Sequence, residues 1–65
     1  MMYSVTIIEF NCNLGNKVDD VLAFIDYDSA IYYVEEFNKD NRAKPGDKVW
    51  CFAMEPIPMH TGSKI

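Results

Sequence analysis

Residues 28–42 read DSAIYYVEEFNKDNR, and this stretch predicts a single amphipathic helix. At about 100° per residue its apolar side chains fall on one stripe, and its charged side chains lie away from that stripe. The stripe consists of Ala30, Tyr33, Val34 and Phe37. Asp28 suits the N-cap position and Asp26 is the alternative, because a carboxylate there accepts hydrogen bonds from the first helical turn. We expect the stripe to pack on a sheet formed by the rest of the chain.

Three strands are predicted around this helix, at residues 3–10, 18–27 and 48–55. The first, YSVTIIEF, is rich in β-branched and aromatic side chains. Residues 11–17, NCNLGNK, contain the turn formers of a hairpin loop, and AKPGD at residues 43–47 predicts the turn after the helix. For residues 18–27 a helix is the competing interpretation. Pro56 and Pro58 are expected to end the last strand.

The resulting order, β-β-α-β, predicts an α+β fold in which the helix covers one face of a three-stranded antiparallel or mixed sheet. Crossover connections within a sheet are right-handed, and the compact solution puts the first strand in the middle. The predicted strand order is therefore 2-1-3. We expect one domain at residues 1–58, followed by a flexible tail at residues 59–65.

Both faces of the predicted sheet carry large apolar side chains, although one helix covers only one face. In the first strand, Ile7 points to one face, whereas Ile8 and Phe10 point to the other. One explanation is irregularity, either a bulge or a tail that folds back through Ile57 and Met59. The other is an interface with a second copy or a different protein, on the bare face or along an exposed edge strand. The candidate interface residues are Trp50, Phe52, Met54, Phe10, Ile8, Phe24 and Tyr32.

The composition is that of a small acidic globular domain. Hydrophobic residues make up 49% of the 65 residues and charged residues 25%, which argues against disorder. The net charge is −4, and the six basic residues form no strong cluster. Direct binding of DNA or RNA is therefore not expected, because neutralising phosphates requires clustered basic side chains. An acidic surface that mimics nucleic acid is an alternative to a merely solvated one.

No set of residues has the spacing of a catalytic or metal site. The single histidine, His60, lies in the predicted tail, and its spacing to Cys12 and Cys51 fits neither a nucleophilic site nor a zinc site. Four acids, Asp19, Asp20, Asp26 and Asp28, could in principle hold a metal, but the D-x-D start at Asp26 and Asp28 lacks the later Gly and Glu of a calcium-binding loop. We predict no enzymatic activity, no cofactor and no metal; an enzyme or metal protein using the acids or the thiols is the competing hypothesis. Whether Cys12 and Cys51 form a disulfide stays open.

The first ten residues, MMYSVTIIEF, lack the basic segment and the small-residue cleavage site of a signal peptide. The longest apolar run is far shorter than a membrane span. These features predict a cytoplasmic protein with no membrane partner.

Residues 22–56 resemble small uncharacterised accessory proteins encoded by bacteriophages. The shared features are an Asp/Tyr helix start at residues 27–30, YDSA, the helix sequence YVEEFN at residues 33–38, and the aromatic strand WCFAMEP at residues 50–56. These are capping, core and turn positions, and no catalytic residue comes with them. The resemblance implies a phage accessory protein in the host cytoplasm, a class that often binds and inhibits a host enzyme or defence complex.

The leading hypothesis is a non-enzymatic protein-binding module that modulates or inhibits a host protein through its sheet. A self-associating assembly subunit, a homodimer through the sheet, is the first alternative. The acidic nucleic-acid mimic is the second.

Overall fold

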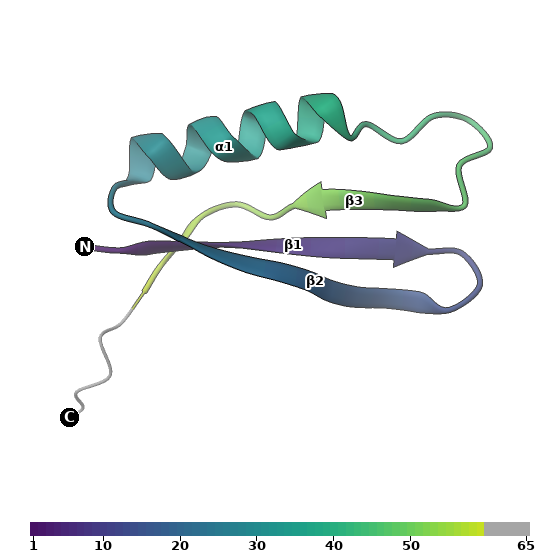
Figure 1. Ribbon diagram of the computed structural model, residues 1–65, viewed down its shortest axis with the longest axis horizontal. Coiled ribbons are helices and arrows are strands. Elements are labelled where there is room, and N and C mark those ends of the chain that lie inside the picture. The colour runs from purple at the N-terminus through teal and green to yellow at the C-terminus, as the bar shows by residue number, and fades with distance from the viewer. Residues whose placement is uncertain (60–65) are drawn as a thin grey trace.

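The computed structural model describes residues 1–59, and in them a sheet is packed on one helix (Figure 1). The elements are β1 (Tyr3–Asn11), β2 (Gly15–Phe24), α1 (Tyr27–Asp40), β3 (Val49–Ala53) and β4 (Ile57–Pro58). The strand order is β2-β1-β3, all pairs are antiparallel, and β4 also pairs with β1. The predicted α+β class, element order and strand order are therefore confirmed.

The helix runs lengthwise along the sheet (Figure 1). Directly opposed residues of an antiparallel pair share a face. In β1, Val5 is opposite Leu22 and Ile7 is opposite Ala53, so these side chains face α1. The buried core lies between this face and the helix and consists of Val5, Ile7, Ala30, Val34 and Ala53. Partly buried Tyr33 and Phe37 surround it, as the predicted stripe requires.

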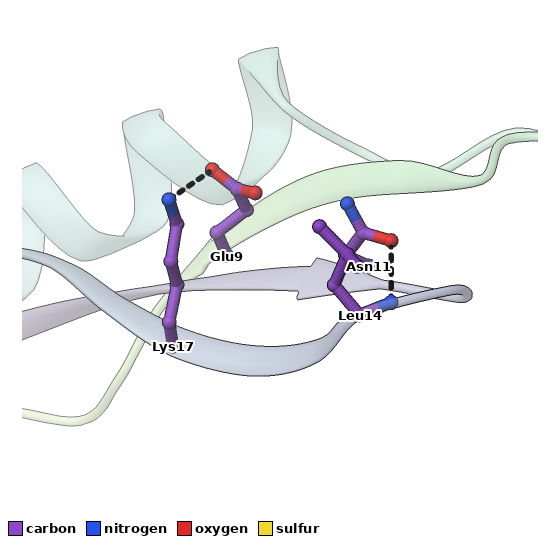
Figure 2. A network of polar contacts seen from close by, with 4 residues as sticks. All are labelled: Glu9, Asn11, Leu14 and Lys17. Carbon is purple, nitrogen blue, oxygen red and sulfur yellow. Dashed lines mark hydrogen bonds and ion pairs between the residues drawn. The ribbon is translucent and has the colours of Figure 1, made fainter.

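The hairpin turn is shorter than the predicted seven-residue loop. The Asn11 side chain accepts hydrogen bonds from the backbone amides of Asn13, at 2.9 Å, and Leu14, at 3.0 Å; Figure 2 shows the second. Gly15 then takes a positive φ of 88°, which glycine adopts without strain. The second strand therefore begins at Gly15 instead of residue 18.

The second strand also ends three residues earlier than predicted, because Asp26 is the N-cap of α1. The Asp26 backbone is extended, with φ −145°, and its side chain accepts a 2.7 Å hydrogen bond from the Ser29 amide. The prediction that Asp28 is the N-cap is therefore wrong, and the alternative, Asp26, is confirmed. Asn41 ends the helix: its backbone amide and side-chain amide both donate to the Phe37 carbonyl, so the helix stops before the predicted Arg42.

The end of the chain folds back onto β1 as β4. Ile57 is opposite Ser4, and the Met59 amide donates a 2.8 Å hydrogen bond to the Met2 carbonyl. This segment pairs with the first residues of β1, whereas β3 pairs with the last ones, so β4 lies within the sheet and does not cover its open side. Residues 60–65, most of the predicted tail, lie outside the described residues.

Two substitutions of the cap Asp26 distinguish how much its hydrogen bond and its charge each contribute to stability. The hydrogen bond from the Ser29 backbone amide lowers the pKa of the Asp26 carboxyl below its ordinary 3.8. Asp26→Ala should lower the melting temperature by roughly 5 °C at pH 7, because the helix loses its cap. Asp26→Asn should retain most of the stability, since asparagine caps equally well.

The pH dependence follows from the sign of the pKa shift. A depressed folded-state pKa stabilises the fold above the unfolded-state value near 3.8 and stops doing so as the pH falls through the lower folded-state value. Melting curves between pH 7 and about pH 2 should therefore fall less steeply for Asp26→Asn than for the natural chain. Parallel curves for the two proteins would contradict a titrating cap.

Candidate functional site

The face of the sheet that points away from α1, here called the open face, is the candidate site. Register defines it: Ile8 is opposite Phe52, and Phe10 is opposite Trp50. On the other side of β1, Thr6 is opposite Val21. The open face comprises Ser4, Thr6, Ile8, Phe10, Asn16, Val18, Val21, Ala23, Trp50, Phe52 and Ile57. Met54 continues it, since its amide donates to the Thr6 carbonyl.

Three aromatic rings form a cluster on the open face. Phe10 stacks on Trp50 with 5.4 Å between ring centroids, and it meets Phe52 edge-on at 6.5 Å. Phe10 and Trp50 are half-buried against each other, whereas 43% of Phe52 is exposed. Aromatic groups of this kind supply much of the binding energy at protein interfaces, because they carry a large apolar area on few rotatable bonds.

A β-bulge in β2 adds a residue to the open face. The register shifts by one residue between Ile7, which is opposite Asp20, and Ile8, which is opposite Val18. In a regular strand Val18 and Val21 would point to opposite faces, because side chains alternate. Here both point to the open face, and they are 58% and 57% exposed. Two consecutive aspartates, a poor fit to a strand interior, are the sequence signal for this irregularity.

Within the described residues, no paired position of the open face carries a charge. Paired strand charges lie on the helix side: Lys17 is opposite Glu9, and their side chains meet at 4.0 Å beneath α1 (Figure 2). Asp20, opposite Ile7, is on the same side. Asp19 is the extra residue of the bulge and has no partner in the register. The Lys17 side chain is 68% exposed, so this ion pair contributes little stability. Its relevance is its position on the helix side, away from the open face.

The open face brings together five of the seven predicted interface residues: Ile8, Phe10, Trp50, Phe52 and Met54. Phe24 lies on the helix side instead, opposite Tyr3, with its ring 5.4 Å from that of Tyr33. Tyr32 is 66% exposed, but it belongs to α1, which covers the other face. The prediction missed Val18, Val21 and Ile57, because their placement depends on the bulge and on β4.

At both outer edges of the sheet, side chains already form hydrogen bonds with some of the backbone groups. On β3, the Asn38 side chain pairs with the Ala53 backbone, accepting from its amide at 2.7 Å and donating to its carbonyl at 3.1 Å. On β2, the Asp20 carboxylate accepts a 2.8 Å hydrogen bond from the Val21 amide. Such groups hinder the addition of another strand. The open face is therefore more accessible to a partner than either edge.

An open groove of about 590 Å³ lies between the second half of α1 and β3. Lys39, Arg42, Trp50 and Cys51 contribute to its lining. Burial raises the pKa of the Cys51 thiol, and the charges of Asp19 and Glu9 add to the effect. A raised pKa is the opposite of what a nucleophilic cysteine requires.

The two cysteines are both free thiols. Cys12 donates its amide to the Lys48 carbonyl, so it lies opposite residue 48 and three positions away from Cys51 along β3. That offset is roughly 10 Å, beyond the reach of a disulfide. Among residues 1–59, no three His, Cys, Asp or Glu side chains are grouped to hold a metal ion; His60 lies outside this range.

Within residues 1–59, α1 is too short and too polar to cross a membrane. Comparison of the chain with protein-family models, curated proteins and solved structures finds no match.

Proposed function

We propose that this chain is a non-enzymatic protein-binding module that docks a partner protein on its open face. The observation that carries the proposal is the combination of an apolar face whose paired positions carry no charge with an exposed aromatic cluster. Small folded proteins seldom leave such a face in water, and large apolar patches rimmed by polar residues mark interaction sites. Phe10, Trp50 and Phe52 are the expected anchors of the complex.

The size of the open face fits a small interface. Strands spaced by about 4.8 Å with a rise of about 3.3 Å per residue give three strands roughly 400 Å² of flat area. Protruding side chains increase the accessible area, so a docked partner removes on the order of 1,000 Å² from water in total. This is the lower limit of specific interfaces, and it favours a partner that binds with modest affinity.

The partner that the sequence resemblance suggests is a host protein. In this proposal the chain is a phage accessory protein that acts in the host cytoplasm and modulates or inhibits the protein it binds. The support is the sequence pattern of α1 and β3 together with the open face.

Site-specific photo-crosslinking tests the proposal. A photoreactive amino acid is placed at Val21 on the open face, and in a control chain at Tyr32 on the outside of α1; both native side chains are more than half exposed. After illumination in bacterial lysate, position 21 should give discrete protein adducts and position 32 should not. Equal or absent adducts at the two positions would contradict the proposal, and mass spectrometry identifies the partner.

A further inference from the structure

We propose that the open face binds a second copy of this chain, giving a symmetric dimer with the two sheets stacked face to face. This inference rests on the proposed function, since it names the partner of the same face. A different protein would then have to compete with self-association for the open face.

A single copy has little buried core. Five hydrophobic side chains are buried, and Val5 is the largest that is fully buried. The Cα radius of gyration is 13.7 Å, against about 10.5 Å for a compact domain of this length, and the shortest dimension is 12 Å. Domains below about 70 residues usually need a disulfide, a metal or a partner subunit for stability. With both cysteines free, a second sheet layer is the addition that this fold can accept.

The distribution of charge favours contact through the open face. Each copy has a net charge of −4, so two copies repel unless their acidic groups are kept away from the contact. Three of the four charged residues of β1 and β2, Glu9, Lys17 and Asp20, lie on the helix side, and the fourth, Asp19, is the unpaired residue of the bulge. A two-fold symmetric contact sets one patch against itself, which an apolar patch tolerates and an acidic patch does not.

The geometry of the sheet also suits a stacked dimer. Two sheets pack face to face at about 10 Å, with strand directions about 30° apart. The product has four layers, α1-sheet-sheet-α1, and encloses the rings of Phe10, Trp50 and Phe52 from both copies. Pairing through the sheet edges is the competing dimer. The Asn38 and Asp20 side chains that occupy backbone groups there disfavour it.

Sedimentation velocity between about 1 µM and about 500 µM tests the dimer. The natural chain should shift from one to two chains of 7.5 kDa as concentration rises. Trp50, the single tryptophan, reports the same event, because its emission should move to shorter wavelength when the open face is covered. This concentration series needs no variant. A protein that stays monomeric throughout overturns the inference.

The variant Val18→Lys/Val21→Lys locates the interface. Both side chains are more than half exposed in a single copy, so the lysines should leave the monomer folded. Two added charges facing their symmetry mates should weaken dimerisation at least about 100-fold. The matched control, Tyr32→Lys, changes an equally exposed apolar residue on α1 and should dimerise normally. A lysine variant that dimerises like the natural chain overturns the stacked arrangement and indicates pairing elsewhere.

The two proposals fail in different ways. A natural chain that remains monomeric, combined with adducts to a different protein from position 21, rejects self-association and leaves the protein-binding face standing. A monomeric chain without adducts at position 21 rejects both. Adducts of twice the chain mass at position 21 support the dimer and the docking role of the open face, and if no other protein is captured they contradict the host-protein partner.

Discussion

Truncating Ile7 to alanine should lower the free energy of unfolding by about 3 kcal/mol, which is most of what a domain of this size has. Ile7 is 3% exposed and lies in the core beneath α1, opposite Ala53. Its loss leaves a cavity that Val5 and Val34 cannot fill without moving the helix. The variant should retain at most about 2 kcal/mol, so a measurable fraction should be unfolded near room temperature.

Ile8→Ala is the matched control, because the same residue type is shortened one position further along the same strand. Ile8 points to the open face and is only partly buried, so a single copy should lose less than about 1 kcal/mol. Urea unfolding followed by circular dichroism, at a concentration below that of self-association, measures both variants. Similar losses for the two would mean that the faces of β1 are wrongly assigned.

Asn38→Ala is the second change with a large expected effect, of about 2 kcal/mol. The Asn38 side chain is the partner of both the amide and the carbonyl of Ala53, a residue with no exposed surface. Without it, two backbone groups of β3 lose their hydrogen bonds in a partly buried place. The freed edge of β3 should also increase aggregation, because an unpaired strand edge recruits other strands.

Asn41→Ala is the control for Asn38→Ala. Asn41 also donates from its side chain to a backbone carbonyl, that of Phe37, at 2.8 Å, but it is exposed. Water replaces that bond readily, so the loss should be a few tenths of a kcal/mol. Thermal unfolding monitored by circular dichroism, with light scattering for aggregation, compares the two. A smaller effect at Asn38 than at Asn41 would contradict the bridging role of Asn38.

The sequence was sufficient to predict the element types and the strand order. Alternating apolar residues identified β1 and β3, and the stripe around Ala30 and Val34 identified the face of α1 that is buried. The right-handed crossover then left β1 in the middle. Each of these features depends on local periodicity or on a general rule of chain connection.

The remaining features depend on contacts between residues distant in the sequence. Nothing in the sequence around Asn38 predicts its hydrogen bonds with Ala53, fifteen positions away. The helix start was misplaced because Asp26 and Asp28 are both good caps, and the extended backbone at Asp26 decides between them. Phe24 was assigned to the interface because both faces of β2 offer apolar side chains. Only the position of α1 shows which of the two faces is covered.

The bulge in β2 has a consequence for how the hairpin folds. If β2 continued without the bulge past the pair of Ile7 and Asp20, Asp19 would lie opposite Ile8, and Lys17 opposite Phe10. Both charges would then point to the open face, and Val18 would move to the helix side. The hairpin in this slipped register is therefore less stable than the native one, and the difference grows with the apolar character of the open face. The residues proposed to bind a partner also help the chain to select its native strand register while it folds.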